Sequence, residues 1–236
     1  MKFRNQKKKY FSLASTERAA EIYIFGDITS WEWLESDVSS YTLARSIQGL
    51  DVDEITVHIN SYGGEVAEGL AIHNSLKNHP ARVRTVCDGF ACSAASVVFM
   101  AGDERIMNPA SLLMIHNAWT SASGSAKELR KAADDLDVIT SASVETYKAR
   151  VNLSDGELTE LLDNETWITP ADAVAWGFAT EVLEDEPSEA VTQSARAAVF
   201  QALTGKPDPH EPPPPPKSEK KTLSTFLSAL SKGGKE

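Results

Sequence analysis

The sequence predicts an α/β fold with a largely parallel sheet. Two observations carry this prediction. Short β-branched or aromatic runs alternate along the chain with segments of helical spacing, a pattern typical of parallel strands joined by helices. Hydrophobic residues make up 42% of the 236 residues, enough for a sizeable core. A chain of this length fits one domain with an appendage, or two small domains.

The elements follow one another in a regular order. The first half predicts a strand over 20–28, a helix over 39–50 that stops at Gly49, a strand over 54–60, a turn over 61–66, a helix over 65–79, a strand over 83–89 and a small-residue helix over 91–102 that holds Ser93 in its first turn. The second half predicts short strands over 104–108 and 111–117 and helices over 124–150, 154–162 and 169–177.

Composition limits the classes of partner. The formal charge of −11 argues against general nucleic-acid binding. Cys87 and Cys92 are the only cysteines, too few for a disulfide framework or a zinc site, which favours a reduced, cytoplasmic compartment. The basic N-terminus is followed by no apolar segment, so we expect no export signal, and no stretch is apolar enough to predict a membrane span.

Composition also divides the chain into four parts. We expect a basic lead-in over 1–20, a main α/β domain over 21–186, an acidic, then Ala-rich, then Pro-rich linker over 187–221, and a short segment over 222–236. This last segment has apolar residues on one helical face. It is either a disordered tail with accidental amphipathicity or a tethered helix that docks on a partner.

Two short stretches have the residue types of a nucleophilic site. Gly63 and Gly64 lie between a strand and a helix, where backbone N–H groups can bind a phosphate or an oxyanion, or form only a tight turn. Ser93 follows the third strand at the start of a helix, where it is either a nucleophile or an ordinary N-cap. Cys92 is the neighbouring alternative, but adjacent side chains on a helix diverge, so both cannot face one site.

A serine nucleophile needs a base and a carboxylate. Of the five histidines, His116 ends an apolar strand, at the sheet edge where α/β sites gather. The other four occupy less suitable places: His58 in a strand, His73 in a helix, His79 before a proline and His210 in the tail. Asp163 and Glu165, just before Trp167, can each orient the base.

Four blocks of the sequence together resemble a known family. INSYGGEV, GFACSAASVVFMAG, LLMIHN and ETWITPADAVAWGFA are similar, in the same order, to the proteolytic subunit of the Clp protease, a self-compartmentalising serine peptidase. The resemblance covers roughly residues 20–185. It implies the ClpP/crotonase-like α/β fold of repeated β-β-α units, with residues 124–150 forming a protruding handle helix.

The resemblance also implies a role for each candidate residue. Ser93 is the nucleophile of the G-x-A-x-S block and His116 is the base. Glu165 stands where the family usually has aspartate, with Asp163 as the alternative third member. The backbone amides of Gly64 and Ala94 form the oxyanion hole. No metal or organic cofactor is implied, and the assembly expected is a homo-oligomeric ring or two stacked rings.

Departures from the cellular pattern refine the expectation. Tyr62 replaces a proline of the cellular members, and the turn, the FACSAAS block and the ETW block look closer to the phage-encoded branch. That branch cleaves scaffold and capsid proteins in the prohead, in the cytoplasm of the bacterial host. Three alternatives remain: a subunit of a degradation complex, a crotonase-like acyl-CoA enzyme, and a catalytically silent assembly protein. A degradation subunit would need an ATPase unfoldase on a separate chain, because this chain has no nucleotide-binding GxxxxGK[ST] motif.

Overall fold

A mixed sheet forms the centre of the molecule. The computed structural model describes residues 11–12, 18–31 and 37–183. Within these residues the strands run in the order β1-β2-β3-β4-β5-β8, and β6 pairs with β4 and with β7. Their bounds are β1 Phe11–Ser12, β2 Ala19–Ile24, β3 Glu54–Ser61, β4 Arg82–Cys92, β5 Glu104–Met107, β6 Leu112–Ile115, β7 Thr166–Ile168 and β8 Glu181–Val182.

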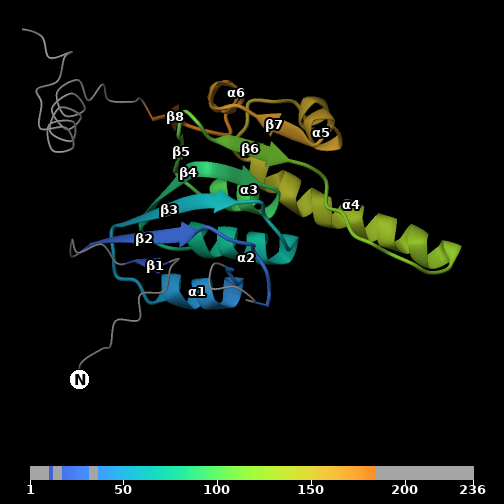
Figure 1. Cartoon of the computed structure of the whole chain (residues 1–236), viewed down its shortest axis with the longest axis horizontal. Helices are drawn as coiled ribbons and strands as arrows, with labels where there is room; N and C mark the ends of the chain where they lie inside the picture. Colours follow the sequence, from blue (N-terminus) through green and yellow to red (C-terminus); the bar gives the residue numbers. More distant parts are fainter. Residues whose placement is uncertain (1–10, 13–17, 32–36, 184–236) are drawn as a thin grey trace, which may run out of the picture. The chain divides into compact units, whose positions relative to one another are not determined.

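Helices connect the parallel strands. Their bounds are α1 Ser40–Gln48, α2 Val66–Lys77, α3 Ala94–Phe99, α4 Ala126–Lys148, α5 Asp155–Asp163 and α6 Pro170–Trp176. The first three join the parallel pairs β2–β3, β3–β4 and β4–β5 in turn, and α4 extends away from the sheet in Figure 1. The predicted α/β class with a protruding helix is therefore confirmed.

The core lies under one face of the sheet. On β3, Ile55, Val57 and Ile59 are fully buried, whereas the residues between them are partly exposed. This alternation arises because successive strand side chains point to opposite faces. The helix α3 contributes five residues to the same core: Ala94, Ala95, Val97, Val98 and Phe99.

The strand β4 is longer than predicted because it pairs with two partners in succession. Its first half pairs with β5, and its second half, from Phe90 to Cys92, pairs with β6. The strand therefore continues three residues past the predicted end at Gly89, and α3 begins only at Ala94. Ser93 consequently precedes the helix, and the expectation that it lies in the first helical turn is wrong.

Other boundaries also differ from the predictions. The predicted strand over 20–28 ends at Ile24, because the chain then leaves the sheet and Ile28 forms only isolated bridges to Val38 and Gly64. The two-residue strand β1 lies inside the predicted basic lead-in over 1–20 and pairs with β2. β7 is not among the predicted strands. The predicted linker 187–221 and the segment 222–236 lie outside the described residues.

The topology brings three strand ends together. β4 and β6 are parallel neighbours, so Ser93 after β4 and His116 after β6 emerge at the same edge. β7 is antiparallel to β6, with Thr166 opposite Ile115, so Glu165 enters from the same edge. In the part of the chain that is described, no helix is both long and apolar enough to cross a membrane.

Candidate active site

Ser93 has an unusual backbone. Its φ of 52° and ψ of −125° lie in a region that non-glycine residues rarely occupy. Such a conformation costs about 1–3 kcal/mol and persists only where the surroundings enforce it. Here the Ser93 N–H donates to the Met114 carbonyl of β6 at 2.8 Å. The conformation turns the chain sharply from strand to helix and presents the side chain at the sheet edge.

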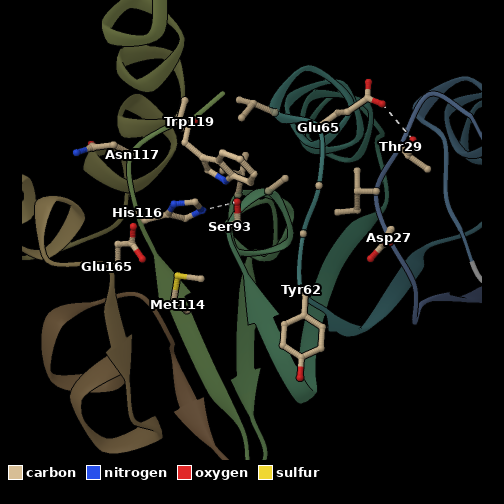
Figure 2. Close-up of a pocket in the computed structure, with 18 of the residues that line it drawn as sticks. Asp27, Thr29, Tyr62, Glu65, Ser93, Met114, His116, Asn117, Trp119 and Glu165 are labelled. Carbon is tan, nitrogen blue, oxygen red and sulfur yellow. Dashed lines mark hydrogen bonds between the residues drawn. The ribbon is translucent and has the colours of Figure 1, made fainter. Parts of the chain in front are cut away.

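The Ser93 hydroxyl does not cap its helix. At the N-caps of α1, α4, α5 and α6, a serine or threonine side chain accepts a backbone N–H of the first turn. The Ser93 side chain makes no such bond and lies 2.8 Å from His116 Nε2 instead (Figure 2). This distance is within the range for a nucleophile and its base. The ordinary N-cap interpretation of Ser93 therefore does not describe the structure.

The two candidate carboxylates have different surroundings. Glu165 lines the same cavity as Ser93 and His116, and Figure 2 shows its side chain beside His116. Asp163 ends α5 and accepts a 2.7 Å hydrogen bond from Asn117 Nδ2. Among the described residues, neither carboxylate forms a hydrogen bond with His116. Glu165 also has a left-handed φ of 48°, directly before the start of β7.

The Gly63–Gly64 turn lies close against Cys92 and Ser93. A Cβ on Gly63 would lie 2.5 Å from the Cys92 carbonyl oxygen and 2.8 Å from Ser93 Cβ, and one on Gly64 would lie 2.1 Å from the Ile28 carbonyl oxygen. Both residues also have positive φ, of 99° and 143°. Only glycine fits either position.

Two backbone amides near Ser93 remain available. The turn is held by the Ile28 N–H donating to Gly63 O and the Glu65 N–H donating to Ile28 O, both at 2.8 Å. Neither the Gly64 N–H nor the Ala94 N–H reaches an acceptor within the described part of the chain, and both residues line the cavity. Free backbone donors beside a nucleophile are what an oxyanion requires.

The cavity itself is large and acidic. It has a volume of about 790 Å³, enough for side chains of a peptide. Its lining includes the carboxylates of Asp27, Glu65 and Glu165 and no Lys or Arg. Hydrogen bonds from Ser30 and Thr29 lower the pKa of Glu65, so that carboxylate stays charged at neutral pH. Glu65 therefore contributes negative charge to the cavity lining.

Cys92 is not placed for chemistry. Its side chain is fully buried at the end of β4, and this burial raises the pKa of its thiol to about 11. A buried, protonated thiol is a poor nucleophile. The described residues also contain no cluster of His, Cys, Asp and Glu suited to a metal ion.

Several residues of the site had not been singled out from sequence. Asp27, Glu65 and Trp119 line the cavity from loops and a helix start that only the fold brings together. Tyr147 also lines it and carries the one buried side chain of α4. It follows Ser143, another residue that lines the cavity, by four positions on the same face of that helix. His58 lies elsewhere and pairs with Asp88 at 2.8 Å.

The fold and the site together define a class of protein: an α/β protein with a serine–histidine pair at a strand–helix junction beside two free amides. A profile of the Clp protease family matches residues 35–186. The chain therefore belongs to the Clp protease family.

Curated relatives agree with this assignment. The chain is 32% identical over 133 residues to an ATP-dependent Clp protease proteolytic subunit of Deinococcus radiodurans, covering 56% of this chain and 65% of that protein. It is 33% identical over 140 residues to subunit 2 of Thermobifida fusca, covering 57% and 67%. It is 30% identical over 140 residues to subunit 1 of Synechococcus sp., covering 58% and 71%.

Proposed function

We propose that the chain is a serine endopeptidase in which Ser93 is the nucleophile and His116 is the general base. The observation that carries the proposal is the 2.8 Å contact between Ser93 Oγ and His116 Nε2, made by a serine that leaves its helix uncapped. Family membership supports the same chemistry. It argues against a silent assembly protein, and the serine–histidine pair argues against a crotonase-like enzyme.

The acylation step follows from this arrangement. A neutral His116 accepts the Ser93 hydroxyl proton through Nε2 while Oγ attacks the scissile carbonyl carbon. The carbonyl oxygen becomes negatively charged and accepts hydrogen bonds from the N–H groups of Gly64 and Ala94. His116 then returns the proton to the leaving amine, the C–N bond breaks, and the acyl group remains on Ser93.

Water then hydrolyses the acyl-enzyme, and Ser93 and His116 take part again. His116 takes a proton from water as the oxygen attacks the acyl carbon, and the proton passes to Ser93 Oγ when the ester bond breaks. Glu165 is the proposed third member, because it lines the cavity beside His116 while Asp163 is engaged by Asn117. It would fix the histidine tautomer once a bound substrate draws the two side chains together, since catalytic hydrogen bonds often tighten only in the substrate complex.

Labelling with a fluorophosphonate tests the nucleophile. The intact protein should gain one adduct, located on the peptide that contains Ser93, and Ser93→Ala should gain none. Cys92→Ala should label as the parent does, because that thiol is buried. An adduct that persists in Ser93→Ala, or a parent that never labels, would contradict the proposal.

A matched pair of variants tests the carboxylate. Glu165→Ala should slow labelling by about 10³-fold, since an unoriented imidazole is a poor base. Asp163→Ala should retain labelling within about tenfold, because its contact is to Asn117 and not to His116. The reverse order of effects would assign Asp163 as the third member.

For the biological role, we propose cleavage of scaffold and capsid proteins during prohead assembly of a phage. The Tyr62-Gly63-Gly64 turn, the FACSAAS block and the ETW block support it by their similarity to the phage-encoded branch. On this proposal the enzyme acts in the bacterial cytoplasm or within the prohead, on protein substrates.

The second candidate is a degradation subunit that works with a separate unfoldase. The printed names of the relatives, which are ATP-dependent subunits, favour it. The two roles differ in what activates the enzyme. Cleavage of a scaffold–capsid mixture without ATP supports prohead maturation, whereas cleavage of a folded protein that requires ATP and an added unfoldase supports degradation.

Either role involves a homo-oligomeric ring. The handle helix α4 exposes Leu129, Val138 and Ile139, with exposed fractions of 43%, 71% and 41%. Exposed apolar side chains of this kind are suited to pack against other subunits. Sedimentation of the full chain, compared with an Ile139→Ser variant, tests whether the Ile139 side chain supports the ring.

A further inference from the structure

The carbonyl of Ser93 receives more hydrogen bonds than a helix start requires. The backbone N–H of Ser96 donates to it at 2.9 Å, and that of Val97 donates at 3.4 Å. The Ser96 hydroxyl donates to the same oxygen at 2.6 Å. The side-chain bond is the shortest of the three, so Ser96 anchors the carbonyl of the proposed nucleophile.

A second hydroxyl, from Tyr147, is hydrogen-bonded to the hydroxyl of Ser96. Tyr147 of α4 places its phenol oxygen 2.8 Å from Ser96 Oγ. A carbonyl only accepts, so the single hydroxyl proton of Ser96 is committed to Ser93 O. The Tyr147 hydroxyl must therefore donate to Ser96 Oγ. The bonds run in one direction, from Tyr147 O–H to Ser96 O–H to the Ser93 carbonyl.

Both hydroxyls are inside the protein. Ser96 is 1% exposed and Tyr147 is 2% exposed, so water does not compete for either bond. Burial also raises the pKa of Tyr147 to about 12, which keeps its donor proton in place over the working pH range. Hydrogen bonds in series within a low-dielectric interior polarise and strengthen one another.

The Ser93 carbonyl is part of the same peptide group as the Ala94 N–H. The peptide bond between Ser93 and Ala94 is planar, so its C=O and its N–H are held in one orientation. That N–H is the Ala94 donor proposed for the oxyanion. Fixing the Ser93 oxygen therefore fixes the direction of the Ala94 N–H, and drawing electron density toward the oxygen makes that N–H a stronger donor. The Ser93 backbone is strained, so without an anchor this peptide plane is free to relax.

We infer that Ser96 and Tyr147 are positioning residues that aim the Ala94 N–H at the oxyanion. The inference rests on the proposed function, because it assigns a role in that reaction to residues that do not themselves bond to the reacting atoms. It predicts that removing either hydroxyl slows acylation without weakening substrate binding.

The experiment uses two probes on the full chain. A fluorophosphonate provides the second-order rate of Ser93 modification and the number of reactive sites, and the burst phase with p-nitrophenyl acetate provides the acylation rate constant and the substrate Kd. Tyr147→Phe should lower the rate per reactive site about fivefold and Ser96→Ala about twentyfold, both less than the 10²-fold or more expected for loss of a direct oxyanion donor. The substrate Kd should stay within about twofold of the parent value.

The double variant separates a series of bonds from two independent effects. If Tyr147 acts through Ser96, then Tyr147→Phe should change nothing further in the Ser96→Ala background. Thr85→Val is the matched control. Thr85 is fully buried and its hydroxyl donates at 2.8 Å to the carbonyl of Phe99, at the opposite end of α3. It should leave the rate per site unchanged while lowering stability.

Several results would overturn the inference. Parent-like rates in Tyr147→Phe and Ser96→Ala would do so, as would independent effects that multiply in the double variant. A raised substrate Kd with an unchanged acylation rate constant in Tyr147→Phe would mean that this residue only lines the cavity. A parent that reacts with neither probe would instead remove the proposed function, and this inference with it.

Discussion

The helices α3 and α4 are stabilised in opposite ways. All six residues of α3 are buried, and the helix is too short to be stable alone. α4 has 23 residues, of which only Tyr147 is buried. Its stability comes from local devices: a capping box at Ser125 and Glu128 and an ion pair between Lys131 and Asp135. The proposed nucleophile Ser93 directly precedes the buried helix, and the side chains proposed for subunit contact are on the exposed helix.

One residue connects the two helices. Tyr147 lies in the last turn of α4 and bonds to Ser96 of α3, while its ring packs edge-on against Phe178 at 5.9 Å. A helix can therefore be exposed along most of its length and still contribute one buried group to the hydrogen bonds behind Ser93.

The largest expected contrast is in core packing. Phe99→Ala in α3 should lower the free energy of unfolding by about 3–5 kcal/mol, because it leaves a cavity in a closed core. Val138→Ala in α4, at a side chain 71% exposed, should cost less than about 0.5 kcal/mol. Urea denaturation of dilute protein measures both. A loss of unfolding free energy in Val138→Ala that grows with protein concentration would show that another subunit covers Val138.

The next effect is on alkaline stability. The pKa of Tyr147 is raised to about 12 in the folded protein, so the unfolded chain loses this proton first, near pH 10. The stability that the neutral Tyr147 side chain contributes is fully present below pH 10 and is lost as the pH rises toward 12. Across that window the parent should lose about 2 kcal/mol more stability than Tyr147→Phe. Guanidinium denaturation at pH 9 and 11.5 tests this, and equal losses in the two proteins would contradict it.

A smaller and local effect is expected at the start of α4. The Ser125 side chain accepts the Glu128 N–H, and the Glu128 carboxylate accepts the Ser125 N–H. Ser125→Ala should cost about 1 kcal/mol, confined to the first turns of the helix. Hydrogen exchange should therefore speed up near residues 126–130 and remain unchanged in α3. Faster exchange in both helices would mean that α4 is not locally stabilised.

The smallest effect concerns the exposed ion pair. Lys131 and Asp135 are four residues apart on α4, and both side chains are more than half exposed. Lys131→Ala should change the free energy of unfolding by no more than about 0.5 kcal/mol, because solvent screens the pair. The difference from the parent should vanish in 1 M NaCl. A difference that survives high salt would indicate that the Lys131 side chain acts through packing.

Much of the fold could be predicted because its signals are local. The alternation of β3, the Pro80 that follows α2 and the Gly177 that ends α6 are each properties of a short segment. The end of β4 could not be predicted in this way. Whether residues 90–92 continue a strand depends on β6, which comes more than 15 residues later and supplies the missing hydrogen bonds.

The same distinction between local and long-range signals applies to the candidate site. The sequence by itself determined the chemical groups: a serine at a strand–helix junction, a histidine at a strand end, two nearby carboxylates and a Gly-Gly turn. Only the tertiary structure decided that the Ser93 hydroxyl turns to His116 instead of capping α3, that Glu165 and not Asp163 lines the cavity, and that Tyr147 reaches Ser96 from 51 residues away. The reason is physical. Residue type and local spacing set which groups and elements are available, whereas distances between segments remote in sequence arise only when strand pairing and core packing bring them together.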